Sequence, residues 1–507
     1  MVEKLGIFAL CIAGLLALGG CATVDPRLDY DRAAEHVRQT TGQESLYRPG
    51  DEEIVARKID ELLADGLTAD EAVQVCLLNN PRLQAAFFDV GIARADVVQS
   101  GLLSNPSLGV SLRLPSGGGL ANLEAGLAQN IVELWQIPAR KRVAERTLDR
   151  AVLELARQAG VLATEAKTAY YHAVAADRAQ TITSENLDIV RQLLDSALAR
   201  QEAGVGTEVD VNLSRSEVRE TELALRSAKL AAFEARSELA TLLGLTMSPD
   251  KLELTEVLPG PPKWTLTAER LLEMARRWRL DIQAARQAVE AAAANVKLER
   301  LRVFPVVELG FELERGERKR SRGEGRRDEG TKARREDEGT DFIIGPSIGL
   351  ELPIFDQNQA RIAVADYAYF QAAKMLDALV REVTQETRLA HARAQTAWDT
   401  ARFYRDRLLP LRETNLELAR DAYGAGKASF LSVLEAQRTL LEARAGYVGA
   451  LEASAVALPE LERVTGQPIQ RILARDETDE NTPAEDGEPP SPNTPETDQS
   501  GTTEERK

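Results

Sequence analysis

Residues Ser107 to Leu114 read Ser-Leu-Gly-Val-Ser-Leu-Arg-Leu, and their apolar and polar side chains alternate without exception. Successive side chains of a β-strand point to opposite faces. One face of this strand would carry only aliphatic side chains (Leu108, Val110, Leu112 and Leu114), and the other would carry Gly109, Ser111 and Arg113. A soluble sheet fits this pattern, with the leucines on a core. A membrane barrel fits it equally, with the leucines on lipid and Arg113 in a wet lumen.

The composition limits the class of protein. The chain has 507 residues, enough for two or more domains or one elongated one, and a net charge of −17. From Asp476 to the end there are eleven acidic and two basic residues, a net charge of −9. We therefore predict an acidic, disordered tail over residues 467–507. The rest of the chain is only mildly acidic, so we expect no nucleic-acid partner.

The N-terminus has the pattern of a bacterial lipoprotein leader. An apolar run from Leu5 to Leu18 has the length of a signal-peptide core, too short to span a membrane. It ends in Leu18-Gly19-Gly20-Cys21, which resembles a lipobox. We predict a signal peptide over 1–20, lipidation at Cys21 and a lipidated linker over 21–50. An ordinary secretory leader cut nearby is the alternative. Ala22, rather than an aspartate, follows the cysteine, and by resemblance to enterobacterial lipoproteins this favours the outer membrane.

Cysteine and histidine offer no chemistry to the mature chain. Cys76 would be the only ordinary thiol, so no internal disulfide can form. The three histidines are far apart, and none has a neighbour at metal-ligand spacing. We expect no metal site and no cofactor. Beyond the leader no stretch approaches 18 apolar residues, so a chain that crosses a membrane would do so with strands.

The region around the opening strand predicts a hairpin followed by very long helices. A second alternating run over 123–128 completes a β-hairpin at about 105–134. Ahead of it we expect a short helix over 51–64 and another from about Thr68 towards Gly101. From Leu148 to Ala173 the apolar residues are spaced four and three apart, which is a heptad seam. A helix over 139–203 would be about 96 Å long. It would end at Gly204, and a return helix would run to about Leu243.

The same order of features then occurs again. Leu83-Gln84-Ala85-Ala86 returns as Ile282-Gln283-Ala284-Ala285, 199 residues later, and Pro106 returns as Pro305. We predict a first repeat over 51–247, a connector over 248–267 and a second repeat over 268–466. The second hairpin, about 304–354, carries a charged insertion over 315–340. We expect a solvated loop there, with a nucleic-acid or ligand patch as the alternative. A second long helix would run from about 361 to 423, with Pro410 as the candidate for a kink.

One chain thus supplies four alternating strands, too few to close a barrel, and an open edge cannot lie in lipid. Two chains would give eight strands around a filled lumen. Three would give twelve strands with room for water. The predicted fold is therefore mostly α-helical with a membrane β-barrel. Few aromatic residues accompany the strands, and the signal for aromatic girdles is weak (Trp135, Phe304, Phe311, Phe342 and Phe355).

Residues 51–466 resemble the outer membrane efflux protein family, the TolC-like channels. The resemblance rests on the two-fold repeat, on Asn105-Pro106 and Phe304-Pro305 before the strands, and on Ala422-Tyr423-Gly424-Ala425-Gly426 followed by 431–437. It implies a homotrimer with a twelve-stranded outer-membrane barrel on an α-helical periplasmic tunnel. A periplasmic adaptor and an inner-membrane pump would be its partners. Such a channel is a passive conduit for efflux or export and has no catalytic chemistry.

By the same resemblance, a periplasmic gate forms where the two helical turns of three chains converge. The residues expected there are three acids (Glu208, Asp210 and Glu435), Tyr423 and the turn glycines (Gly204, Gly206, Gly424 and Gly426). A ring of carboxylates would attract cations and could close the tip through hydrogen bonds. The alternative is that these acids only stabilise the N-terminal turns of their helices through the helix dipole. Ser432 stands where some family members carry an acid, a departure from a two-ring acidic gate.

Two other functions compete with the channel. A non-porous periplasmic coiled-coil scaffold or adaptor lipoprotein would explain the heptads but not the four alternating strands. A secreted enzyme would need a site, and the sequence contains no nucleophile elbow, metal cluster or phosphate loop. The sequence does not name the cargo, which in such channels includes drugs, metal cations, oligosaccharides and proteins.

Overall fold

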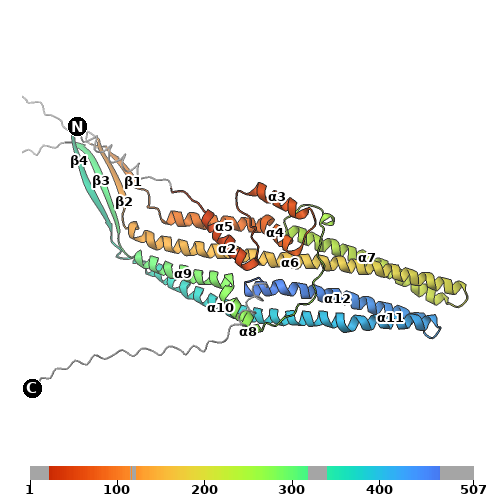
Figure 1. The fold of residues 1–507 in the computed structure, drawn as a ribbon. Helices are drawn as coiled ribbons and strands as arrows, with labels where there is room; N and C mark the ends of the chain where they lie inside the picture. The colour runs from red at the N-terminus through yellow and green to blue at the C-terminus, as the bar shows by residue number, and fades with distance from the viewer. Residues whose placement is uncertain (1–21, 115, 117–120, 318–339, 469–507) are drawn as a thin grey trace, which may run out of the picture.

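The computed structural model describes residues 22–114, 116, 121–317 and 340–468. Cys21, the leader, most of the charged insertion and the acidic tail lie outside these residues. The molecule is elongated, with a sheet at one end and two helical hairpin tips at the other (Figure 1). The central helices lie between these two ends, so the sheet and the tips are joined by continuous helical segments.

The sheet has four antiparallel strands in the order β1-β2-β3-β4. They are β1 (Ser107–Arg113), β2 (Asn122–Asn130), β3 (Val306–Glu317) and β4 (Thr340–Glu351). None of the described residues forms a core over the leucine face of β1, because Leu108, Val110 and Leu112 are 71%, 65% and 61% exposed. The soluble-core interpretation of this strand is therefore wrong for the single chain. The charged insertion is also shorter than predicted, since β3 extends to Glu317 and β4 begins at Thr340.

The helices are α2 (Arg27–Thr41), α3 (Glu52–Leu63), α4 (Ala69–Asn79), α5 (Pro81–Ser100), α6 (Glu133–Glu202), α7 (Glu208–Leu242), α8 (Ala268–Trp278), α9 (Leu280–Leu301), α10 (Gln359–Phe403), α11 (Leu409–Gly424) and α12 (Phe430–Thr465). With 70 residues, α6 is about 105 Å long. It begins at Glu133, six residues before the predicted start at 139, and therefore contains Pro138 near its N-terminal end. The helix–helix–hairpin–long helix–return helix order occurs twice along the chain.

The linker predicted over 21–50 is not extended throughout its described residues, 22–50, because these contain α2. Asp29 on this helix is fully buried, and Arg94 of α5 donates to its two carboxylate oxygens at 2.6 and 2.8 Å. Tyr30 packs edge-on against Phe87, with ring centroids 5.5 Å apart. These partners lie more than 50 residues away in sequence, so the polar composition of the segment gave no sign of them.

The helix predicted from Thr68 towards Gly101 is broken at Asn80. Its start is correct, because Thr68 and Glu71 form a capping box. The side chain of Asn80 then accepts hydrogen bonds from the backbone N–H groups of Arg82 and Leu83, which caps α5. Its amide also donates to the carbonyl of Leu242 at 2.8 Å, so the break fixes the end of α7 against the α4–α5 corner.

The second long helix is interrupted where a kink was expected. A short π-helix, η2 (Tyr404–Leu408), separates α10 from α11 and ends two residues before Pro410. Proline cannot donate a backbone hydrogen bond, and an inserted π-turn is a common way to accommodate that loss.

The main core lies near the middle of the molecule, where α2, α4 and α5 pack on α6 and the end of α7. There the Tyr170 hydroxyl donates to the carbonyl of Leu67 at 2.8 Å.

Candidate functional site

Both helical hairpins turn through glycines at the end of the molecule opposite the sheet (Figure 1). Gly204 and Gly426 have φ values of +75° and +72°, a left-handed conformation that other residues adopt at a cost. In the first turn, the N–H groups of Val205 and Gly206 both donate to the carbonyl of Arg200. A side chain at Gly206 would also lie within 3.0 Å of the backbone of α6. These glycines therefore let each turn close tightly at the end of its hairpin.

The acids expected at the gate contact only their own hairpins in the described structure. Asp210 forms a capping box with Thr207, with hydrogen bonds of 3.1 Å in both directions. Glu435 pairs with Arg438 at 3.0 Å on the same helix, and Glu208 is exposed in the first turn of α7. In the single chain these three carboxylates therefore act within a helix, and none of them joins one hairpin to the other.

Tyr423 joins the two hairpins through a residue that the sequence did not single out. The guanidinium carbon of Arg200, at the end of α6, lies 4.5 Å from the centre of the Tyr423 ring. This is a cation–π geometry. Tyr423 also packs against Phe430, with ring centroids 5.5 Å apart. Arg200 escaped notice because a basic residue in the last turn of a helix is already explained by the helix dipole.

A second contact joins the hairpins further from their tips. Gln437 of α12 donates to the side-chain carbonyl of Asn186 of α6 at 2.9 Å, and both residues are buried. Apolar packing surrounds this pair, since Leu193 of α6 contacts a cluster on the other hairpin (Leu416, Val433 and Leu440). A buried amide pair fixes the relative height of two helices, because a shift would leave both groups without a partner.

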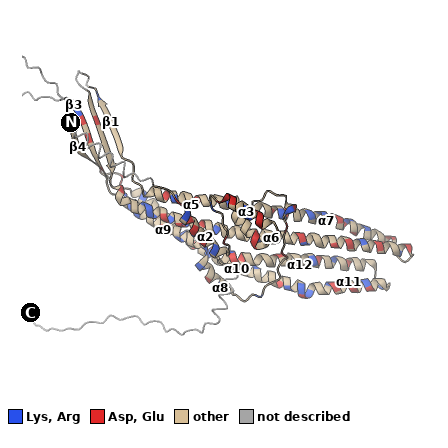
Figure 2. Ribbon diagram, turned by 45° about the horizontal axis from the view of Figure 1, so that its top comes forward, with Lys and Arg blue, Asp and Glu red and all other residues tan. Residues whose placement is uncertain are grey.

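The face of the sheet opposite the leucines is polar and acidic. Strand register places five carboxylates on it (Glu124, Glu308, Glu312, Glu314 and Glu351) together with Arg113. Arg113 pairs with Glu124 at 2.8 Å. Glu312 lies in a row with Gly126 and Gly345, so no basic side chain stands beside it across the strands. Five carboxylates against one guanidinium give this described face a net charge of −4, and Figure 2 shows acidic residues along the strands.

Sequence comparison assigns the chain to a known family. The sequence model described as "Outer membrane efflux protein" matches residues 72–245 and 271–467, which include most helices and all four strands. The chain belongs to the outer membrane efflux protein family. The protein is accordingly an efflux channel of the outer membrane that extends into the periplasm. Members of this family are channels and not enzymes.

Individual relatives agree with this assignment. The chain is 26% identical over 414 residues to the cobalt-zinc-cadmium resistance protein CzcC of Cupriavidus metallidurans, covering 80% of this chain and 91% of that protein. It is 26% identical over 472 residues to the pyoverdine export outer membrane protein OpmQ of Pseudomonas aeruginosa, covering 85% and 91%. The solved structure of the outer-membrane channel OprN has a TM-score of 0.64 at 21% identity, covering 85% and 96%. This structural likeness shows the fold.

The described part of the channel contains no helix with both the length and the apolar composition needed to cross a bilayer. Nor do the described residues bring three or more His, Cys, Asp or Glu side chains together as metal ligands. Cys76, the one cysteine among the described residues, is buried, and burial raises the pKa of its thiol to about 12. A protonated thiol at neutral pH is a packing group and not a nucleophile.

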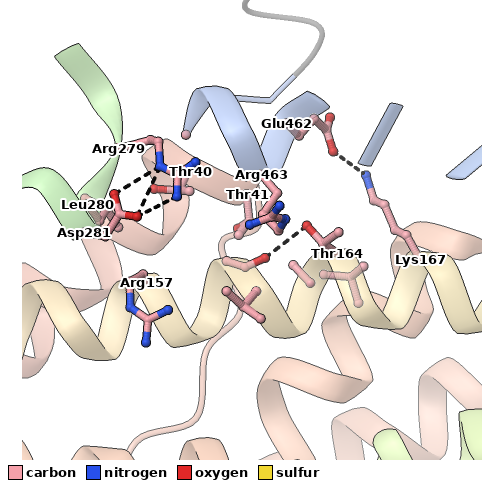
Figure 3. A pocket seen from close by; sticks show the side chains of 15 residues that line it. Thr40, Thr41, Arg157, Thr164, Lys167, Arg279, Leu280, Asp281, Glu462 and Arg463 are labelled. Atoms are coloured by element: carbon pink, nitrogen blue, oxygen red, sulfur yellow. Dashed lines mark hydrogen bonds and ion pairs between the residues drawn. The ribbon is translucent and has the colours of Figure 1, made fainter. Parts of the chain in front are cut away.

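A charged cavity of about 70 Å³ lies in the middle of the channel protein, where α2, α6, α9 and α12 meet (Figure 3). Its basic side chains all have acidic partners. Arg279 pairs with Asp281 at 2.6 Å and also with Glu386, while Lys167 pairs with Glu462 at 3.4 Å. Burial would raise the pKa of Glu386, but hydrogen bonds and charge from Arg463 and Arg279 outweigh it and lower that pKa. The cavity is therefore walled by an ion-pair network that holds the helices together.

Proposed function

We propose that three copies of this chain form a twelve-stranded barrel on an α-helical tunnel, the outer membrane component of a tripartite efflux system. The observation that carries the proposal is the open sheet. Strands β1 and β4 both have an unpaired edge, and the leucine face beside them is exposed. An open edge in lipid leaves backbone groups without partners. Because four antiparallel strands place β4 of one copy antiparallel to β1 of the next, three sheets close without a change of strand direction.

Exposed apolar side chains on the helices support an assembly of several chains. One stripe on α10 consists of Val364, Tyr367, Phe370 and Met375, and Phe88 and Ile92 form another patch on α5. A periplasmic helix gains stability when such side chains are covered by a neighbouring copy. Val205, Val209 and Leu431 are exposed at the hairpin tips, which suits docking of a periplasmic adaptor that in turn holds an inner-membrane pump.

The acidic face of the sheet lines the conduit in this arrangement. Three copies would bring a net charge of about −12 to the barrel lumen, which favours cations over anions. Cationic cargo is consistent with the likeness to CzcC, whose name refers to cobalt, zinc and cadmium resistance. The pump selects the cargo, and the channel contributes a preference for positive charge.

The gate of this channel is the convergence of the hairpin tips. Arg200–Tyr423 and Asn186–Gln437 hold the two hairpins of each chain together. Asp210 would maintain the first turn as a helix cap. Lipidation at Cys21, six residues before α2 in the sequence, would add a second attachment to the membrane.

The purified full-length protein tests the proposal. We expect it to fractionate with outer membranes, to migrate as a trimer and to conduct ions in planar bilayers with a preference for K⁺ over Cl⁻. Glu312→Gln should weaken that preference, whereas Glu53→Gln, on an exposed position of α3 far from both the sheet and the hairpin tips, should leave it largely unchanged. A monomer without conductance would instead support the non-porous scaffold.

A further inference from the structure

The junction between the strands and the helices carries an unusual number of exposed apolar side chains. They are Leu134 and Trp135 after β2, Phe304 before β3, and Leu352, Ile354 and Phe355 after β4. Trp135, Phe304 and Phe355 are 66%, 63% and 92% exposed, and no core of the described chain covers them. Aromatic side chains at such a boundary are typical of the membrane–water interface. In the proposed barrel, this level corresponds to the periplasmic surface of the outer membrane.

Two arginines lie directly beyond this aromatic level, and neither has a partner in the described structure. Arg142 is on α6 and Arg361 is on α10, the two long helices that begin at the junction. Both are exposed, and neither forms a hydrogen bond or ion pair with the described residues. Arg361 lies in the first turn of α10, which contains no acidic residue. A cation at that end is unfavourable with the helix dipole, and no acidic residue in that turn offsets it.

The direction of these side chains points them towards the membrane. Helical side chains tilt towards the N-terminus of their helix, and for α6 and α10 that end is the junction. Arg142 follows Trp135 by seven residues, two turns of helix, so the two share a face about 10 Å apart along the axis. A long arginine side chain can span much of that distance and place its charge at the interface.

Other basic groups at the junction are already neutralised. Arg140 lies 3.7 Å from Glu133, and Arg302 lies 2.6 Å from Glu299. The nearby carboxylate of Asp356 accepts a hydrogen bond from the backbone N–H of Asn358 at 2.9 Å, which holds it in the turn before α10. Among the basic groups that the structure describes at the junction, Arg142 and Arg361 therefore remain as the charges that an external anion can pair with.

We propose that Arg142 and Arg361, beneath the aromatic belt of Trp135, Phe304 and Phe355, form a collar that binds the phosphate headgroups of anionic phospholipids in the periplasmic leaflet. The inference rests on the proposed barrel, because the barrel sets the level of the bilayer. A guanidinium pairs with a phosphate through two parallel hydrogen bonds, and an adjacent indole ring prefers the same interfacial depth. Three copies would place six such arginines around the channel.

Lipid-dependent thermal stability tests the collar in the full-length protein. The detergent-purified channel is heated with added phosphatidylglycerol or phosphatidylethanolamine, and loss of the assembled form is followed. We expect phosphatidylglycerol to raise the melting temperature more than phosphatidylethanolamine. Arg142→Gln/Arg361→Gln should lose more than half of that difference. Arg150→Gln is the matched control, because Arg150 is also exposed and unpartnered but lies eight residues, about 12 Å, further along α6.

Three outcomes would overturn the collar. The double variant could keep the full preference for phosphatidylglycerol, Arg150→Gln could lose as much as the double variant, or inorganic phosphate could reproduce the stabilisation. The first two outcomes would show that these arginines do not distinguish phosphatidylglycerol from phosphatidylethanolamine. The third would show that the site binds free phosphate. Conductance in phosphatidylethanolamine bilayers tests the channel function independently of the collar. The double variant should conduct there like the parent protein, because only lipid binding is changed.

Discussion

The contact between Arg200 and Tyr423 leads to the sharpest prediction about gating. Arg200→Gln removes the cation from the Tyr423 ring but keeps a polar side chain of similar reach. A cation–π contact contributes about 0.5–2 kcal/mol, and we take about 1 kcal/mol because both residues are half-buried. If one hairpin opens at a time, the open-to-closed ratio should rise about fivefold. If all three must separate together, about 3 kcal/mol is lost and the rise should be on the order of 150-fold.

Single-channel recording in planar bilayers measures this ratio as open probability. Tyr423→Leu should open the channel as Arg200→Gln does, and the double variant should open no further than the more open single variant. Tyr423→Phe should remain closed, because the phenyl ring keeps the cation–π partner while losing the hydroxyl. Arg191→Gln is the matched control, since Arg191 is also on α6 but pairs with Asp188 and Glu222 within its own hairpin.

Two results would refute the reasoning. If the effects of Arg200→Gln and Tyr423→Leu on the free energy of opening simply add, the two side chains are not coupled. If Tyr423→Phe opens the channel as much as Tyr423→Leu, a hydrogen bond from the hydroxyl, and not the ring, holds the hairpins together.

Three further predictions concern the stability and reactivity of the helical part. Asp29→Asn leaves Arg94 without its carboxylate and should cost about 3 kcal/mol in chemical denaturation, so a loss under 1 kcal/mol would contradict the importance of this pair. Folding lowers the pKa of Glu386, so the stability that this carboxylate contributes is fully present above its unfolded pKa, near 4.5, and is lost as the pH falls through the folded value. Glu386→Gln should therefore make the melting temperature fall less steeply as the pH is lowered. An unchanged slope would show that Glu386 does not contribute to the acid sensitivity. Cys76, with a pKa of about 12, should resist maleimide at pH 8 until the protein unfolds, whereas rapid labelling of the native protein would contradict its burial.

Features that depend on near neighbours could be predicted from the sequence. The alternation at 107–113 identified a strand and its two faces, and the heptad spacing after Leu148 identified a helix longer than a compact domain holds. Thr68 starts its helix with the capping box that its sequence suggests. Each of these signals lies within about seven residues, because side-chain direction in strands and helices repeats with periods of 2 and 3.6. The family resemblance, drawn from motifs of this kind, was confirmed.

Features that join distant segments were decided only by the tertiary structure. The segment predicted as an extended linker folds as α2 because Asp29 finds Arg94, 65 residues later. Arg200 meets Tyr423 across 223 residues, and Asn186 meets Gln437 across 251. No local period records such pairs, since each side chain alone has an ordinary explanation as a helix end or a surface polar group. The aliphatic face of 107–114 likewise fitted either a soluble core or lipid, and only the exposure of these side chains among the described residues of the folded chain removed the first.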